Sequence, residues 1–582
     1  MKNVMLLICV LLSATTLLAL DAYPKTSIAE DATATWCTFC PNAYAGLEIV
    51  HGEYDFSQFV SVRYYETSGL YGTAETDARN DFYVVTGYPT VILDGLTHFV
   101  GAGATTAATG EPYLTAVESA TLMPAPIQVE IDSLDTTTGA VSATVTMHST
   151  TAALNNDTLL FVLLEDEVTV SHTHLARDLV YETVSLTGAG STTTVTTSFT
   201  IDPSWNELNL NAVAIVQRVA DREVLQAAST FPQPAQSVRA MAPIDRLVFG
   251  PSSGTYTTGD ITVMNVGDAD TYTVDVIVDS GPAGTQVSFT DEFGATHTTP
   301  QPLSLASDEQ TYYNVNLVPG GPGQIEYHLE ITSTNLASPL IVPLTYFTDD
   351  LDVMLIDDDG GDPYEVYFTD VLDAAGKSYG VWDRGMSTLP AEIALYYNTL
   401  IWNVGWAFPS LDADDKLFLT TYLGDGNNLF LSGQDIGWDL NDPAANPDPV
   451  WYHTYLHASW VRDDTNILFL DGVPGDPITD GLTPHIAGPG GANNQEYPDE
   501  INAFDADATV ILNYQGDGGG ATRSVDSVSG ARVVYLGFGF EGIDNAQDRY
   551  DLLIPSLDWL EGVVFRDDFE SGTTGAWTTS SP

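Results

Sequence analysis

The chain has 582 residues, with 79 Asp and Glu against 17 Lys and Arg, which gives a formal net charge of −62. Proteins bind nucleic acids chiefly by placing Lys and Arg against phosphates, so this balance excludes a nucleic-acid partner as a leading hypothesis. Charged residues are only 16% of the chain and hydrophobic residues 44%, which is enough apolar material for folded cores and argues against disorder.

The first 22 residues have the pattern of a secretory signal peptide. Lys2 gives a positive start, residues 4–20 are almost wholly apolar, and Ala19 and Ala22 are small residues suited to a cleavage site. No later stretch reaches the ~18 uninterrupted apolar residues of a membrane-spanning helix. The sequence therefore predicts an extracytoplasmic protein, secreted or held at the cell surface, without a transmembrane helix.

Residues 23–124 alternate helical and strand-like patterns and contain one C-x-x-C motif, formed by Cys37 and Cys40. Because Cys9 lies in the signal segment, these are the only cysteines of the mature chain. A single pair is too few for a fold stapled by disulfides, and a structural zinc site needs four ligands. His51, the nearest histidine, is expected on an exposed helix face. The pair therefore needs an explanation of its own.

The segment Trp36-Cys37-Thr38-Phe39-Cys40-Pro41, the helical pattern after it and the later Gly87-Tyr88-Pro89-Thr90 together resemble the thioredoxin fold. In that family the first cysteine lies at a helix N-terminus, where backbone N–H groups and the helix dipole favour a thiolate. The resemblance implies that Cys37 attacks, that Cys40 resolves, and that Trp36 packs over the pair. It also implies that Pro89 is a cis-proline opposite the disulfide.

Two interpretations of the cysteine pair stay open. The dipeptide Thr38-Phe39 carries no positive charge, and Glu30 and Asp31 stand just upstream, so the surroundings disfavour a thiolate. The pair either exchanges disulfides with protein thiols or is a structural disulfide without an exchange partner.

From about 125 to 235, apolar residues alternate with polar ones, as in 141–147, which predicts the half-buried strands of a β-sandwich. Residues 1–235 as a whole resemble a bacterial family named after a twenty-eight-kilodalton outer-membrane protein, most clearly in 168–178 and 211–228. Those proteins join an exported thioredoxin-like domain to a β-sandwich. The resemblance implies a Gram-negative outer-membrane or extracellular location. On 168–178, His172 and His174 would share one strand face, which is a polar face or, less commonly, a metal pair.

A Pro- and Gln-bearing linker at 231–236 precedes a second region of strands. Its turn at 265–268 and the alternating strand at 272–278 are typical of immunoglobulin-like sandwiches. From about 351 buried strands alternate with helices, which predicts a doubly wound parallel sheet. The expected strands are 353–356, 399–402, 428–431 and 533–536, and the expected helices are 364–375 and 412–423.

Residues 351–563 resemble class I glutamine-amidotransferase-like (flavodoxin-like) domains. Active members need a Cys nucleophile on a strand–turn–helix elbow, followed by a His and a Glu. The matching turn, Leu431 to Asp435, has no Cys, and no His precedes Glu541. Ser432 lacks the flanking glycines of a G-x-S-x-G elbow, and Thr454 replaces the glutamate that a zinc peptidase would need between two histidines. Amidotransferase and peptidase activities are therefore not expected.

An acidic cluster follows the first buried strand of this region. Asp357, Asp359 and Asp362, with glycines between them, fall at the carboxyl end of the strand, where open α/β sheets bind ligands. Grouped carboxylates suit Ca²⁺. The alternative is a solvated turn before the next helix, and no cofactor is required by the rest of the chain.

The fold class expected is multidomain, α/β plus all-β. Its segments are a signal peptide (1–22), a thioredoxin-like domain (23–124), a β-sandwich (125–235), an immunoglobulin-like β-sandwich (236–348), an amidotransferase-like α/β domain (349–564) and a tail (565–582). Two functions remain. The first is thiol–disulfide exchange with protein thiols or disulfides; the second is non-catalytic binding of an extracellular ligand or adhesion, with a structural disulfide.

Overall fold

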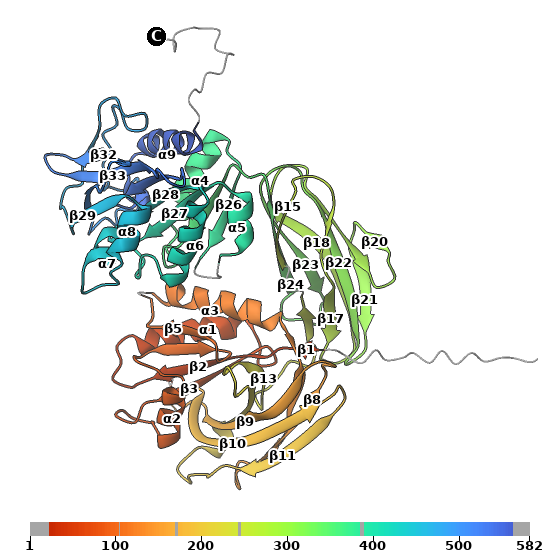
Figure 1. Ribbon diagram of the computed structural model, residues 1–582. Helices are drawn as coiled ribbons and strands as arrows, with labels where there is room; N and C mark the ends of the chain where they lie inside the picture. The colour runs from red at the N-terminus through yellow and green to blue at the C-terminus, as the bar shows by residue number, and fades with distance from the viewer. Residues whose placement is uncertain (1–21, 104, 169–172, 243–245, 385–388, 563–582) are drawn as a thin grey trace, which may run out of the picture. The chain divides into compact units, whose positions relative to one another are not determined.

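The computed structural model describes residues 22–103, 105–168, 173–242, 246–384 and 389–562 (Figure 1). Cys9, His172, most of the predicted signal segment and the tail at 565–582 lie outside these residues. The described chain is mostly β-structure, arranged in several sheets and sandwiches. It forms two compact units. The first comprises 1–243, 261–271 and 304–311, and the second comprises 244–260, 272–303 and 312–582.

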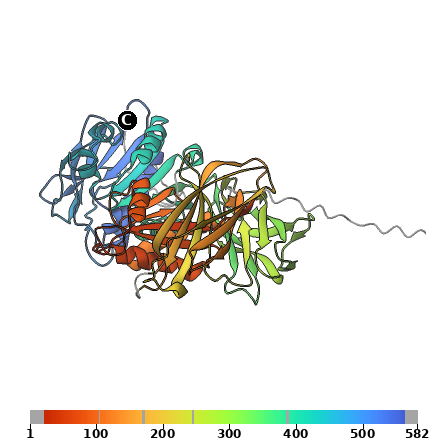
Figure 2. The ribbon, with the colours of Figure 1, turned by 90° about the horizontal axis from the view of Figure 1, so that it is seen from below.

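An eight-stranded sheet runs through the first unit, whose elements are coloured mainly from red to yellow in Figures 1 and 2. In spatial order its strands are β13 (Val224–Ser229), β12 (Leu210–Gln217), β9 (Ala153–Glu165), β10 (Leu175–Thr187), β3 (Phe59–Tyr65), β2 (Ser27–Thr33), β4 (Thr90–Leu93) and β5 (Thr97–Val100). Strands β2 and β3 are parallel, whereas β4 is antiparallel to β2. Arg63 of β3 pairs with Leu175 of β10, so one sheet joins the strands of 23–124 to those of 125–235.

The two faces of β2 serve different cores, because successive side chains of a strand point to opposite sides. Ala29 packs with helix α1 (Cys40–Glu53) and helix α3 (Thr106–Thr121), which lie together over the sheet (Figure 1). Ile28 packs with β3 and with sandwich strands β9 and β12. A second layer of β7 (Ile127–Leu134), β8 (Ala140–Met147) and β11 (Thr192–Ser198) covers the sandwich part through its own apolar core.

A buried ion pair fixes helix α2 (Ala74–Phe82) to this sheet. Arg79 donates to both carboxylate oxygens of Glu30, at 2.8 and 2.9 Å, and neither side chain reaches solvent. The hydroxyl groups of Tyr64 and Tyr83 also donate to Glu30. Arg79 then donates to Gln217 of β12 at 2.8 Å, so the network ties α2, β2 and the sandwich strands together.

The second unit is built on a sheet that is parallel in one half and antiparallel in the other. The parallel strands, in spatial order, are β26 (Tyr379–Asp383), β25 (Val353–Asp357), β27 (Thr399–Gly405), β28 (Asn428–Gly433) and β34 (Arg532–Leu536). Strands β33 (Gly519–Val525), β32 (Ala508–Tyr514) and β30 (Leu470–Gly472) extend it in antiparallel fashion, which the sequence did not predict. A separate pair is formed by β29 (Ala458–Arg462) and β31 (Glu500–Ala503).

Helices cover both faces of the parallel strands (Figure 1). Those on one face are α4 (Glu365–Ala375) and α9 (Ala546–Glu561); those on the other are α5 (Ala391–Tyr396), α6 (Ala413–Gly424), α7 (Ile436–Asn441) and α8 (Pro449–Tyr455). The predicted helices 364–375 and 412–423 are thus α4 and α6, within one residue at each end.

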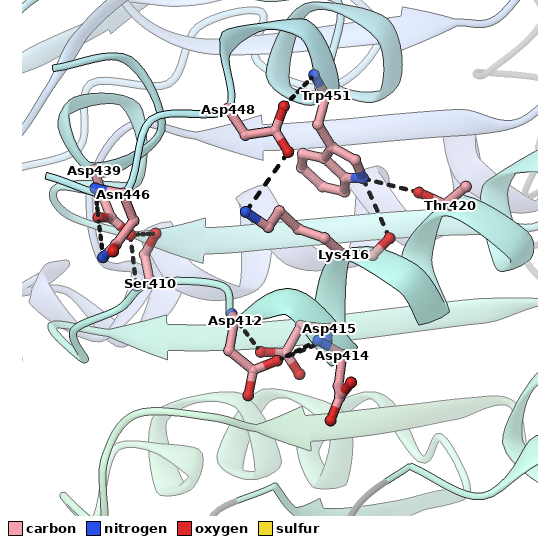
Figure 3. A network of polar contacts seen from close by, with 10 residues as sticks. All are labelled: Ser410, Asp412, Asp414, Asp415, Lys416, Thr420, Asp439, Asn446, Asp448 and Trp451. Atoms are coloured by element: carbon pink, nitrogen blue, oxygen red, sulfur yellow. Dashed lines mark hydrogen bonds and ion pairs between the residues drawn. The ribbon is translucent and has the colours of Figure 1, made fainter. Parts of the chain in front are cut away.

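Polar contacts fasten α6, α7 and α8 to one another (Figure 3). Asp412 caps α6 by accepting from the N–H groups of Asp414 and Asp415. Trp451 of α8 donates its indole N–H to Thr420 of α6 at 3.0 Å. Asp439 of α7 accepts from Ser410 and from Asn446. These bonds stabilise three short helices, which would be too short to be stable in isolation.

Strands between 238 and 348 are divided between the two units. In the first, β14 (Val238–Met241) pairs with β17 (Ile261–Asn265). In the second, one sheet contains, in spatial order, β15 (Leu247–Gly250), β24 (Leu340–Thr348), β23 (Gln324–Thr332) and β18 (Asp270–Ser280). Strand β22 (Gln310–Val318) pairs with β16 (Tyr256–Thr257) and with β19 (Gln286–Asp291). Strand β19 also pairs with β20 (Thr296–His297). No helix of the described residues is long and apolar enough to cross a membrane.

The Glu30–Arg79 pair is expected to dominate the stability of the first unit. Arg79→Met leaves a buried carboxylate without its cation, so the free energy of unfolding measured in urea should fall by about 3–5 kcal/mol. Arg218→Met is the matched control, because Arg218 is 38% exposed and pairs with Asp221 at 2.9 Å. Such surface pairs are worth about 0–1 kcal/mol. Equal losses in the two variants would contradict the assignment.

Candidate functional sites

Cys37 and Cys40 form a disulfide at the start of helix α1. Cys40 is the first residue of the helix, and its backbone N–H donates to Cys37 Sγ at 3.1 Å. Cys40 is 6% exposed, whereas Cys37 is partly exposed between the exposed side chains of Trp36 and Phe39. A thiolate from outside therefore has access to Cys37 rather than to Cys40.

The segment around Pro89 approaches the same end of strand β2. The peptide bond between Tyr88 and Pro89 is cis, and Thr90 then pairs with Ala32 of β2. Tyr88 and Trp36 meet edge to face, with ring centroids 5.8 Å apart. The Trp36 indole N–H donates to Ser68 at 2.9 Å, so this ring is held beside the disulfide while 58% of its surface stays exposed.

A cavity of about 170 Å³ lies behind the disulfide. Both cysteines line it, together with Asp31, Arg63 and Tyr44. Burial raises the pKa of the Asp31 carboxyl to about 6, and the Arg63 guanidinium, 3.8 Å away, opposes that rise. Among the described residues, Asp31 Oδ1 has no hydrogen-bond partner. Asp31 can therefore hold or release a proton near neutral pH inside the cavity that contains both sulfur atoms.

The two acidic residues upstream of the motif have different environments. Sequence alone treats Glu30 and Asp31 alike, as charges that disfavour a thiolate. Glu30 points to the opposite face of β2, where Arg79 neutralises it, and Asp31 alone shares the cavity with the disulfide. The sequence signal that distinguishes the two residues is the alternation of side chains along a strand, which places neighbouring residues on opposite faces of the sheet.

Two histidines of the first unit form a buried chain with a serine. His51 contacts Ser61 at 2.9 Å, and Ser61 contacts His174 at 2.8 Å. The expectation that His51 is exposed was wrong, because the residue faces β3 and the rings of Phe56 and Phe59. Burial lowers the pKa of both histidines to about 3, so they are neutral at physiological pH. His174 is buried just before β10 instead of presenting a metal ligand on its face.

In the second unit an acidic residue, Asp435, lies in the turn after β28. Asp435, between β28 and α7, has a φ of +65°, a left-handed conformation that costs energy in residues other than glycine. Ser432 instead lies within β28, fully buried, and accepts a hydrogen bond from the N–H of Phe540 at 2.7 Å. The side chain at the turn is therefore a carboxylate, and Ser432 is not a nucleophile.

Three groups of potential metal ligands occur in the described part of the second unit. Asp357, Asp359 and Glu365 form one, with one ligand atom from each within 4.8 Å of the others. Asp362, expected from the sequence as a third ligand, is exposed and not part of this group. Burial, followed by the charge of Asp359, raises the pKa of Asp357 to about 9.

The other two groups have partners of their own. Asp499, grouped with Asp435 and Asp463, accepts from two backbone N–H groups and from the Trp460 indole at 2.8 Å. His457, grouped with Asp505 and Asp507, lies 2.9 Å from Asp505, and its other ring nitrogen is 3.3 Å from Asp526. In both groups, hydrogen bonds from the surrounding residues already satisfy carboxylate oxygens.

No protein-family model and no curated protein matches this chain. Among solved structures, an exo-β-1,4-mannosidase from an Opitutaceae bacterium is 12% identical, with a TM-score of 0.24, over 37% of this chain and 36% of its own. A PapD-like domain of human CEP192 is 12% identical, with a TM-score of 0.14, over 20% of this chain and 90% of its own. A conjugative transposon lipoprotein from Bacteroides eggerthii is also 12% identical, with a TM-score of 0.15, over 20% of this chain and 98% of its own. Similarities at this level indicate no activity.

Asp31→Asn is expected to stabilise the first unit at pH 8. The folded-state pKa of Asp31 is raised from 3.8 to about 6, so the charged carboxylate costs stability above pH 6. At ~1.4 kcal/mol per pKa unit, the variant should gain about 3 kcal/mol at pH 8 and almost nothing below about pH 3, where the carboxyl is protonated in both states. Amide hydrogen exchange of β2 and β3 measures the difference, with the exposed Asp81→Asn as control. A gain that is independent of pH would contradict this account.

Proposed function

We propose that the first unit contains an exported thioredoxin-like domain that exchanges disulfides with protein thiols through Cys37 and Cys40. The observation that carries the proposal is the disulfide between the partly exposed Cys37 and the buried Cys40, the first residue of α1, beside a cavity that Asp31 also lines. The order of elements β2, α1, β3, α2, β4, β5, α3 and the cis bond before Pro89 support the same assignment. The signal-like N-terminus supports an extracytoplasmic location, at the outer membrane or outside the cell.

The exchange begins when a substrate thiolate attacks Cys37 Sγ. The bond between Cys37 and Cys40 breaks, a mixed disulfide forms on Cys37, and Cys40 leaves as a thiolate. A second substrate thiolate then attacks the substrate sulfur of the mixed disulfide and releases the Cys37 thiolate. The substrate is oxidised to a disulfide by two electrons and the cysteine pair is reduced. In the reverse direction the Cys37 thiolate attacks a substrate disulfide, and Cys40 resolves the product.

The surroundings of the two sulfur atoms stabilise their thiolates in different ways. The N–H of Cys40 points at Cys37 Sγ, which stabilises negative charge on Cys37 when the bond opens. Cys40 is buried, so its thiolate needs a proton, and Asp31 is the carboxyl in the shared cavity that can provide or accept it. Arg63 keeps that carboxyl from becoming a permanently neutral acid.

The alternative function is extracellular binding or adhesion with a structural disulfide. The observation in its favour is the second unit, whose helix-covered parallel strands support an amidotransferase-like domain with Ser432 buried and Asp435 at the turn. There the sheets serve as a scaffold, and most of the chain has no part in redox chemistry.

Two measurements on the full chain separate these functions. Insulin reduction in the presence of dithiothreitol is expected for the wild type and should be lost in Cys37→Ser. Cys40→Ser should attack a disulfide-containing peptide with its Cys37 thiolate, release one peptide thiol and stay trapped as the mixed disulfide, which Cys37→Ser cannot form. A reduction potential below about −300 mV, with no turnover, would refute the exchange function and favour the structural disulfide.

A further inference from the structure

Asp357 and Asn403 lie at the point where the parallel sheet of the second unit changes direction. Asp357 ends β25, and Asn403 lies beside it near the end of β27. The chain passes from β25 to β26 on one side and then returns past β25 to β27 on the other, so the direction of the connections reverses between β25 and β27. Open α/β sheets bind ligands in the crevice at the carboxyl ends of such strands.

The carboxylates gathered there have no cationic partner. Asp357, Asp359 and Glu365 approach one another within 4.8 Å, and Asp359 is 4% exposed. No Lys, Arg or His of the described residues forms an ion pair with any of the three. Arg384, whose backbone N–H donates to Asp357, directs its guanidinium to Asp412 and Asp415 instead. Buried carboxylates without a counter-charge are costly.

Two further polar side chains at this edge are fully buried and incompletely bonded. Asn403, 0% exposed, holds its amide nitrogen 3.3 Å from both Asp357 Oδ1 and Asp359 Oδ2, while its oxygen has no hydrogen-bond partner among the described residues. Glu541 is also 0% exposed, and its Oε2 has no hydrogen-bond partner in the part of the chain that the structure describes. It lies on the short helix η3 (Phe540–Gly542), which contacts β27 and α4, the elements that carry Asn403 and Glu365.

The Asn403 amide can be turned over without moving its neighbours, because its oxygen and nitrogen have nearly the same shape. The turned amide points its oxygen at the two carboxylates. That arrangement is repulsive by itself and favourable only if a cation lies between them.

We propose that this edge binds a hard divalent cation through Asp357, Asp359, Glu365 and the turned Asn403 carbonyl. All of these donors are oxygens, as Ca²⁺ and Mg²⁺ prefer, and no His or Cys is among them to favour Zn²⁺. The cation neutralises the group and satisfies the Asn403 oxygen.

The chain provides a matched control at the neighbouring residue. Asp358 is an acidic residue of the same segment, but its side chain accepts from the Trp402 indole at 2.9 Å, away from the cluster. Asp358→Asn therefore removes one carboxyl group within a residue of the site and leaves all proposed ligands in place.

The test is calorimetric titration of the EDTA-treated, desalted full chain with CaCl₂ and, separately, with MgCl₂, in 0.15 M KCl to screen exposed charges (about physiological ionic strength). We expect one saturable site with a Kd of about 10⁻⁴ to 10⁻³ M for the preferred ion. Asp359→Asn and Glu365→Gln should each weaken binding by at least about tenfold, whereas Asp358→Asn should change it by less than about threefold. Comparing the two ions identifies which one the site prefers.

Thermal unfolding in EDTA checks that each variant is folded; Glu365, on a helix and partly exposed, is the substitution least able to disturb the fold. The absence of saturable binding of either ion to the wild type would overturn the proposal. Equal weakening in Asp358→Asn and in the two ligand variants would also overturn it, because the loss of binding would then not depend on the proposed ligands. Insulin reduction does not depend on this site, so either result leaves the proposed exchange function unaffected.

Discussion

Arg79 neutralises Glu30 inside the first unit, and much of that unit depends on this interaction. Glu30 lies on β2, which pairs with β3. On the same face of β2, Ile28 packs against β3 and the sandwich strands. Arg79 closes this face from helix α2 and reaches Gln217 beyond. In a chain with 17 Lys and Arg against 79 Asp and Glu, a guanidinium is a scarce partner, and here it is used in the core.

Two fully buried carboxylates of the second unit, Asp499 and Glu541, are held by neutral donors instead. Asp499 is satisfied by backbone N–H groups and an indole, and Glu541 by the amides of Asn494 and Gln495 on one oxygen only. Neutral donors stabilise a carboxylate less than a charge does. The group at Asp357 has few hydrogen-bond donors and no Lys, Arg or His partner among the described residues, and this distinguishes it from the two other acidic groups of the same unit.

Sequence patterns located the main elements of the second unit, since buried strands such as β27 and amphipathic helices such as α4 have strong periodicity. They missed β30, β32 and β33, because short antiparallel strands with glycines carry little signal. The cysteine motif identified the candidate redox site, but the position of Arg63 depends on β3 lying beside β2 in space. Asn403 and Glu365 were missed for the same reason, since both join Asp357 only after the sheet is formed.

The pairing of β3 with β10 has a consequence for how the chain can be divided. Strands β2 and β3, which flank the helix that carries the cysteine motif, belong to the same hydrogen-bonded sheet as the sandwich strands. Sandwich residues cover Ile28, Val60 and Val62. A fragment that stops near residue 124 would carry an open strand edge and an uncovered apolar face, and both features promote aggregation. The part of the chain that can be expressed intact is therefore the cysteine motif together with the sandwich strands.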